Sequence, residues 1–296
     1  MAASPKFRTQ FDPRHGEAVE VAPGIVRVVA PNASPYTFTG TNTYLVGRDR
    51  LLMVDPGPND QSHKEALIRA IAERPVDGII ITHTHRDHTE LAPALAQAMK
   101  APIIAFGAHM AVRELRPSEV NPLVNSNDYD LPIDQTLAHG QLIGSDIYTL
   151  EAIHTPGHTE NHICLALRKR GMATHFLLSG DHVMGWNTTI IAPVDGHMGH
   201  YIDSLDVLLA RSETTYFPGH GGRVESAPTL VRAIRHHRIM RERAILAQAK
   251  KGSAGPPYDP HGIAAVLYPN IAPNLKGAAA LNVQAHLDYL LETERL

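Results

Sequence analysis

The sequence predicts an α/β protein in which helices cover packed sheets. Short runs of β-branched residues separated by polar turns indicate strands, first at residues 25–30, 43–46 and 51–54. Residues 62–73 then place apolar side chains among charged ones at near-helical spacing, which indicates a helix. The chain has 296 residues, 43% of them hydrophobic, which is enough for one large domain with a smaller companion.

The later elements continue this mixture. A triple isoleucine at residues 79–81 indicates a buried strand. Further strands are expected at residues 102–106, 147–153, 162–167 and 174–178. Further helices are expected at residues 91–99, 109–115, 226–251 and 275–291, with another beginning near Asp259. The change to long helices places a domain boundary near residue 230, which gives a larger domain at 1–230 and a small C-terminal domain at 231–296.

Composition excludes several classes of protein. The formal net charge of -3 carries no global basic signal for nucleic-acid binding. The only cysteine, Cys164, excludes an intramolecular disulfide framework, and no apolar run approaches the roughly 18 residues that a membrane span needs. The first twenty residues lack the apolar stretch of a secretory signal. We therefore expect a cytoplasmic enzyme without a membrane partner.

A histidine-rich segment follows the triple isoleucine directly, as Thr-His-Thr-His-Arg-Asp-His at residues 82–88. It therefore lies at the end of a strand, where loops carry function. His83 and His85, two residues apart in an extended segment, can point to the same side and bind one metal. Asp87 and His88 lie past the bend and can reach a second metal. The sequence therefore predicts a metal site at this strand end.

Three later segments offer further metal ligands, each at the end of an expected strand. They are Thr-Pro-Gly-His ending at His158, Ser-Gly-Asp ending at Asp181, and Phe-Pro-Gly-His ending at His220. Glycine beside a ligand lets the backbone pass close to a crowded metal centre, and proline fixes the approach of the chain. The repeated Pro-Gly-His pattern is therefore consistent with metal binding.

These motifs, HxHxDH, PGHT, SGD and PGH in this order, resemble the metallo-β-lactamase superfamily. The resemblance implies a four-layer αββα sandwich with two metals in the cleft between the sheets. It assigns the first metal to His83, His85 and His158. It assigns the second to Asp87, His88 and His220, and makes Asp181 the bridge.

The ligand types suit zinc, with manganese or iron as alternatives. Two such metals can share a water whose pKa falls toward roughly 7, and the resulting bridging hydroxide is the expected nucleophile. Asp87 is the expected catalytic residue, because it can orient the hydroxide and shuttle its proton. We therefore expect a zinc-dependent hydrolase.

The substrate remains open at this point. Other segments, among them residues 39–47, 155–162 and 179–185, are similar to the lactamase-beta-like family that includes a single-strand RNA endonuclease. That resemblance implies a winged-helix-like C-terminal domain and a phosphodiester in single-stranded RNA, or a related small ester, as substrate. The alternatives are a thioesterase of the hydroxyacylglutathione hydrolase type, a non-catalytic nucleic-acid-binding module with structural metals, and a β-lactamase.

Candidate substrate contacts come from two segments. Trp186, Thr188 and Thr189 follow the Ser-Gly-Asp motif closely and could line the mouth of the substrate site. A basic stripe on the expected helix 226–251 could follow phosphates, and its central members are Arg235, Arg238 and Arg241. The alternative is a solvated helix face, and the low aromatic content of 5% weighs against base stacking.

Asp55 and several histidines lie outside these motifs. Asp55 ends a strand beside the metal loop and is a candidate to hydrogen-bond a ligand histidine. Histidines without motif spacing, including His109 and His162, are interpreted as ordinary polar residues.

Overall fold

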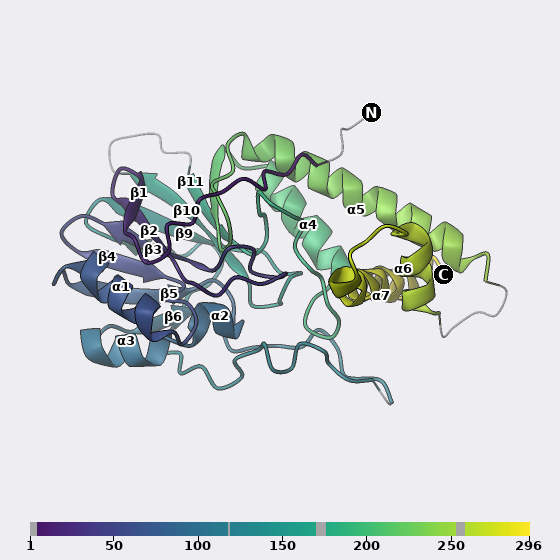
Figure 1. Cartoon of the computed structure of the whole chain (residues 1–296), viewed down its shortest axis with the longest axis horizontal. Helices are drawn as coiled ribbons and strands as arrows, with labels where there is room; N and C mark the ends of the chain where they lie inside the picture. Colours follow the sequence, from purple (N-terminus) through teal and green to yellow (C-terminus); the bar gives the residue numbers. More distant parts are fainter. Residues whose placement is uncertain (1–4, 118, 170–175, 253–257) are drawn as a thin grey trace.

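The computed structural model describes residues 5–117, 119–169, 176–252 and 258–296, and two sheets form its centre (Figure 1). The first sheet has seven strands in sequence order: β1 (Val19–Ala22), β2 (Ile25–Val29), β3 (Asn42–Gly47), β4 (Leu51–Val54), β5 (Val76–Ile81), β6 (Ile103–Ala105) and β7 (Gln135–Thr136). The second has five strands in the order β12 (Thr215–Pro218), β11 (Phe176–Gly180), β10 (Ile163–Lys169), β9 (Tyr148–His154) and β8 (Leu142–Gly144).

Strand direction changes within each sheet. Strands β1 to β4 pair antiparallel, whereas β4 to β7 pair parallel. Strands β8 to β11 pair antiparallel, and β12 joins β11 in parallel. The parallel pairs bring the carboxyl ends of β4 and β5 together in one sheet, and those of β11 and β12 together in the other.

Helices cover the outer face of each sheet. Helices α1 (Gln61–Ile71) and α3 (Ala92–Met99) pack on the first sheet, burying Leu67 and Leu95 against Ile79. Helices α4 (Met198–Leu209) and α5 (Ala227–Ala249) pack on the second sheet. A separate apolar cluster fills the space between the sheets and includes Leu52 and Leu165. Side chains alternate between the two faces of a strand, so each sheet packs against helices on one face and against the other sheet on the other face. The expected four-layer αββα sandwich is confirmed.

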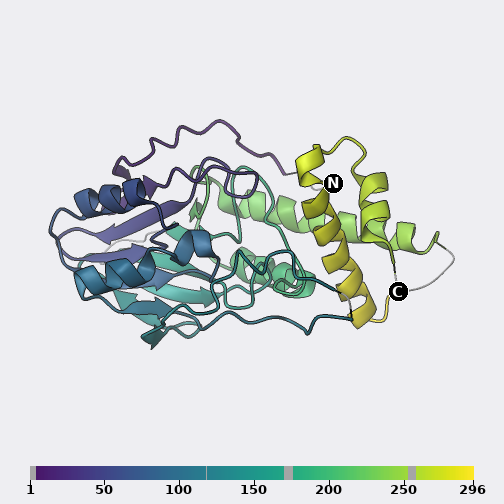
Figure 2. The same ribbon diagram turned by 60° about the horizontal axis from the view of Figure 1, so that its bottom comes forward.

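The C-terminal part is helical. Beyond α5 come α6 (Pro260–Leu267), a short 3-10 helix η1 (Pro273–Leu275) and α7 (Lys276–Glu292), gathered at one end of the molecule (Figure 2). The end of α5 packs on α7, where Ile245 joins Val283 and Leu287 in a cluster of its own. The described residues after Pro218 contain no strand, so they supply no wing for the expected winged-helix domain. The boundary expected at residue 230 falls inside α5.

The prediction of a helix at residues 109–115 is wrong. This stretch forms no regular element, and side-chain bonds to distant segments hold it instead. Arg113 and Arg116 both bond Asp288 on α7, and Arg113 also bonds Glu119. These long-range ion pairs override the local helical spacing. Of the strand expected at 174–178, residues 174 and 175 lie outside the described residues, and β11 begins at Phe176. None of the described helices combines the length and apolarity that crossing a bilayer requires.

A partly buried charge cluster joins β9 to the segment before β12 and gives a test of the fold. Arg211 donates hydrogen bonds to Glu151 and Glu213, and its hydrogen bond lowers the pKa of Glu151. We expect Arg211→Met to lower the free energy of unfolding by about 3 kcal/mol at pH 7, because two poorly exposed carboxylates lose their partner. A lowered glutamate pKa contributes stability above its ordinary pKa that is lost as pH falls through the folded pKa. The difference from wild type should therefore shrink below about pH 4.3.

Urea unfolding at pH 7 and at about pH 3 measures this difference. The matched control is Arg168→Met, since Arg168 also bonds Glu151 but is 65% exposed. It should cost no more than about 1 kcal/mol. An equal loss in both variants, or a loss in Arg211→Met that does not change with pH, would contradict the assignment.

Candidate metal centre

All seven predicted metal ligands converge at one edge of the sandwich. The loop after β5 and the short helix α2 (Arg86–Thr89) carry four of them. His158 follows β9, Asp181 follows β11 and His220 follows β12. Backbone hydrogen bonds join these loops across the two sheets: Gly219 N donates to Gly180 O, and Asn42 N donates to Gly219 O. The ligands therefore share one edge because their strands end there.

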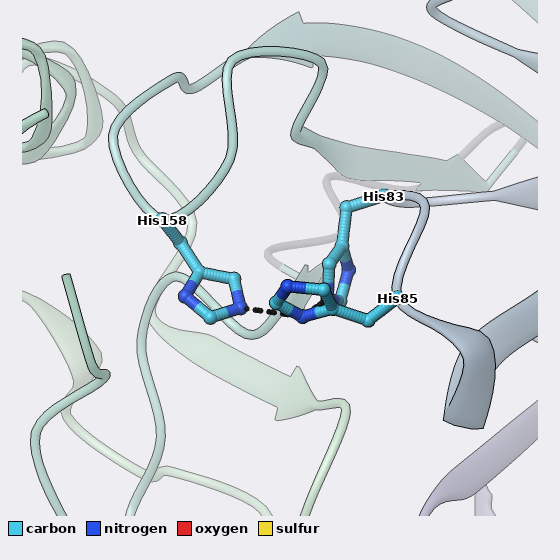
Figure 3. A group of neighbouring side chains, drawn as sticks. All are labelled: His83, His85 and His158. Carbon is cyan, nitrogen blue, oxygen red and sulfur yellow. Dashed lines mark hydrogen bonds between the residues drawn. The ribbon is translucent and has the colours of Figure 1, made fainter. Parts of the chain in front are cut away.

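Three histidines form the first group of ligand atoms. His83 Nε2 lies 3.0 Å from His85 Nδ1, and His158 Nε2 lies 3.1 Å from the same atom. Figure 3 shows the three rings turned toward a common point. Burial lowers the pKa of His85 to about 3 and that of His83 well below its ordinary value. Both rings are therefore neutral, which is the form that binds a metal.

A second group combines two histidines and two carboxylates. Asp87 Oδ2 lies 3.3 Å from His88 Nε2 and 3.4 Å from His220 Nε2. Asp181 faces both groups, since its Oδ2 lies 3.2 Å from His220 Nε2 and 3.8 Å from His158 Nε2. Asp181 thus occupies the place of a bridging ligand between the two groups.

The arrangement fits divalent metals. His88 Nε2 and Asp181 Oδ1 are buried and have no hydrogen-bond partner among the described residues. Such atoms are costly unless something else satisfies them. Gly219 leaves the necessary room, because a Cβ there would lie 2.4 Å from Asp181 Oδ1 and 2.8 Å from His88 Cε1. Imidazole and carboxylate together form a suitable donor set for zinc, manganese or iron.

The outer nitrogens of four ligand histidines are fixed by hydrogen bonds. His88 Nδ1 pairs with Asp55 Oδ2 at 2.9 Å, so the role expected for Asp55 is confirmed. The other three pairs are His83 Nδ1 with Thr82 Oγ1 at 3.0 Å, His158 Nδ1 with Ile190 O at 2.7 Å, and His220 Nδ1 with Gly40 O at 3.2 Å. Such partners set the orientation of each ring and the nitrogen that remains free for a metal.

The interpretation of three residues changes with the structure. His162, taken as an ordinary polar residue, is buried against His83, and its Nε2 accepts a hydrogen bond from the backbone N of Asp181 at 3.2 Å. His109, also taken as ordinary, bonds Asp195 Oδ1 at 2.9 Å and Thr84 Oγ1 at 3.1 Å. Thr41 Oγ1 donates to Asp87 Oδ2 at 2.9 Å. Thr41 and His162 lie in segments that carry the family resemblance, but no role was predicted for either residue, and His109 lies in none of these segments.

A pocket of about 660 Å³ opens from the metal centre. Asp87 and His158 lie at its inner end, and Trp186, Thr188 and Thr189 line it as well. Thr189 is also within 3.2 Å of His158 Nδ1. The three candidate mouth residues are therefore near the metal centre, and their contact with substrate stays a prediction.

The three arginines of the expected basic stripe are bonded within the chain. Arg238 lines the pocket but is only 3% exposed, and it donates to Thr189 O and to Asn282 Oδ1. Arg235 pairs with Asp206 on α4, and Arg241 lies 4.4 Å over the ring of Tyr268. Arg235 and Arg241 lie outside the described lining of the pocket.

The second ligand group gives a pH prediction for metal binding. Burial opposes a charge on His88, but Asp87, Asp181 and Asp55 outweigh it and raise its pKa to about 10. Asp181 likewise raises the pKa of His220 against burial. The His88 ring is therefore an imidazolium at pH 6.5 in the metal-free protein, and a metal at its Nε2 must displace a proton. Loading two zinc ions should release about one proton or more, and affinity should rise with pH.

Calorimetry in buffers of different ionisation enthalpy measures this release. Asp55→Asn is the matched variant, because it removes one of the carboxylates that raise the pKa of His88. It should release fewer protons and bind metal about 10 to 100 times more weakly. A binding enthalpy that does not depend on the buffer would contradict the assignment.

Comparisons with known proteins agree with this centre. Residues 36–220 match the family model of the metallo-beta-lactamase superfamily. A beta-lactamase-like protein 2 homolog from Drosophila melanogaster is 28% identical over 281 residues, covering 92% of this chain and 89% of that protein. An atrochrysone carboxyl ACP thioesterase from Paecilomyces divaricatus is 28% identical over 212 residues, covering 71% of this chain and 59% of that protein.

Solved structures show the same fold. A beta-lactamase domain protein from Burkholderia ambifaria matches with a TM-score of 0.75 at 20% identity, covering 95% of this chain and 90% of that chain. A metallo-beta-lactamase family protein from Thermus thermophilus matches with a TM-score of 0.71, also at 20% identity, covering 93% of this chain and 95% of that chain. Together with the ligand cluster, the family match shows that the chain is a metal-dependent hydrolase belonging to the metallo-β-lactamase superfamily.

Proposed function

We propose that this protein hydrolyses an acyl thioester, with zinc as its metal. The observation that carries the proposal is the shape of the pocket, which runs from the metal cluster to a wall built by the C-terminal helices. That wall and its approaches are largely apolar and include Met184, Trp186, Ile190, Tyr268, Ile271, Leu275, Ala278 and Ala279. An apolar wall suits an acyl chain, and the metal cluster lies at the end where its carbonyl would react.

The charges of the pocket favour a thioester over single-stranded RNA. A phosphodiester backbone needs a series of free cations. Arg235, Arg238 and Arg241 were expected to supply it, but each is bonded within the chain. The similarity to an atrochrysone carboxyl ACP thioesterase supports the thioester. That relative extends well beyond this chain, since only 59% of it is covered, so its acyl group is not carried over.

Two metals, when bound, would supply a water of lowered pKa and polarise the thioester carbonyl. The residues that would hold them are His83, His85 and His158 on one side, and Asp87, His88 and His220 on the other, with Asp181 between. In the overall reaction water adds its oxygen to the acyl carbon and the C–S bond breaks. The carboxylic acid and the thiol leave.

Asp87 is the residue placed to handle the proton. Its side chain is 28% exposed and lines the pocket, whereas that of Asp181 is 9% exposed. Burial would raise the pKa of Asp87, but His88 and His220 lower it, so the carboxylate is charged at neutral pH. Its Oδ2 accepts the Thr41 hydroxyl, while Oδ1 has no hydrogen bond to a described residue. Oδ1 is therefore the atom that would take the proton from the attacking water.

Two arginines would have roles other than proton transfer: Arg238 would position the wall of the pocket, and Arg86 would contact the substrate. Arg238 ties Thr189 and Asn282 together and so fixes the wall between the metal loops and α7. Arg86 is exposed, lines the pocket beside Asp87 and makes no side-chain hydrogen bond or ion pair to a described residue. It is placed to meet the polar part of the carrier that bears the thiol.

The Asp87→Asn variant tests the reaction. We expect its kcat on an acyl thioester to fall at least about 100-fold, because an amide cannot accept the proton. Circular dichroism and metal content measured beside the rate show whether fold and loading survive. In the second arm, zinc-loaded wild type and Asp87→Asn are each incubated with a labelled single-stranded RNA. If the wild type cuts the RNA, the variant does not, and the thioester stays intact, the proposal is overturned in favour of a ribonuclease.

Ala278→Phe tests the apolar wall. Ala278 lies on α7, is half-buried and lines the pocket, so a phenyl ring there would occupy space needed by a long acyl chain. We expect kcat/KM for a long-chain acyl thioester to fall about tenfold while that for an acetyl thioester changes little. The control is Ala265→Phe, on the exposed face of α6 and outside the described pocket lining. Equal effects of both variants, or equal losses on both substrates, would count against the wall as the acyl site.

A further inference from the structure

A second pocket, of about 350 Å³, lies behind the metal loops. Gly185 and Gly222 line it, and they follow the ligands Asp181 and His220 by four and two residues. Three arginines line the same pocket, namely Arg8, Arg27 and Arg223. The pocket shares no described lining residue with the pocket of the metal centre.

Arg27 is the unusual residue of this second pocket. It lies on β2, is only 7% exposed, and its Nε is buried without a hydrogen-bond partner. No carboxylate among the described residues forms an ion pair with its guanidinium. Among the described residues, the ring of Phe11 contacts the guanidinium, and its centroid lies 4.6 Å from Cζ. A cation over an aromatic ring gains less than burying an unpaired charge costs.

The described lining of the second pocket carries three arginines and one acid. Glu225 pairs with Arg8 at 3.8 Å and with Arg223 at 2.7 Å. Glu20, the one acid that lines the pocket, accepts the backbone N–H of Gly24 at 2.9 Å. Asp12 and Arg14 are the nearby charges of the N-terminal segment, and Arg14 pairs with Glu17. None of the described acids lies within ion-pair distance of the Arg27 guanidinium. Burial lowers the pKa of Arg27 and outweighs the attraction of Asp12, which acts from farther away.

We propose that this second pocket binds a small oxyanion, a phosphate or carboxylate group carried by a metabolite, with the Arg27 guanidinium as its counter-ion. A guanidinium presents a planar fork that matches both groups. Arg8 and Arg223 stand at the same pocket and add positive potential, while Phe11 closes one side of the site. The site is separate from the metal centre and does not depend on the proposed thioesterase activity.

Calorimetric titration of zinc-loaded protein with inorganic phosphate, and in a second arm with succinate, tests the site and tells the two groups apart. We expect saturable binding of at least one of them to the wild type. Arg27→Met should weaken it at least about tenfold, since the charge and the fork are both lost. Arg27→Lys, which keeps the charge but not the fork, should bind with intermediate affinity. The matched control Arg69→Met changes an exposed arginine on α1 and should bind as the wild type does.

The metal centre could also bind phosphate, and the design separates the two sites. Binding at the metal centre would persist in Arg27→Met. Equal binding by wild type and Arg27→Met, or no binding of either anion by the wild type, would overturn the proposal. Thermal unfolding shows whether Arg27→Met is folded. If Arg27→Met does not fold, Arg27→Lys provides the test. A lower anion affinity in Arg27→Lys, with the melting temperature of the wild type, still assigns the site.

Discussion

Asp55 is a buried carboxylate on which the geometry of the metal centre depends. Its two oxygens accept hydrogen bonds from Thr82 N at 2.8 Å, Thr82 Oγ1 at 2.7 Å and His88 Nδ1 at 2.9 Å. A buried carboxylate is costly unless it is fully bonded, so the loop after β5 is held in the conformation that satisfies it. The same Thr82 hydroxyl also faces His83 Nδ1 at 3.0 Å. Asp55 therefore orients one ligand directly and a second through Thr82.

The clustering of the seven candidate ligands was predictable because their residue types, their spacing and their positions at strand ends can all be read from the sequence. Asp55 was predictable for the same reason, since it ends a strand beside the metal loop. The roles of His162 and Thr41 were not predicted, because the resembling segments that contain them do not show which side chain contacts a ligand. Their roles arise only when the start of β10 packs against the end of β11, and when the segment before β3 reaches α2. The sequence pattern alone indicated layered α/β structure, and the αββα arrangement came from the resemblance.

The arginines of α5 show a different limit of sequence reasoning. A run of basic residues indicates charge, but not what faces it. Helix α5 packs between α4 and α7, so Arg235 meets Asp206 and Arg238 meets Asn282 instead of solvent. The segment at 109–115 behaves in the same way, because partners on α7 hold it away from a helix. In both cases an ion pair or hydrogen bond between distant segments determines the local structure. The two bonded residues lie more than twenty positions apart in the sequence.

Helix α7 links these features to substrate choice. Its Asp288 holds Arg113 and Arg116 of the loop beside the pocket, while its Asn282 receives Arg238 and also accepts from Ile191 N at 3.2 Å. The loop at 113–116 and the segment after Trp186 are thus both fixed to the helix that contributes to the far wall of the pocket. The metal ligands come from strand ends, and α7 reaches them only indirectly, since Asn282 binds Ile191 N beside Ile190, whose carbonyl oxygen pairs with His158. Most of the metal cluster is therefore fixed by the sheets, whereas the C-terminal helices build the far wall of the pocket that the proposed function assigns to the acyl chain.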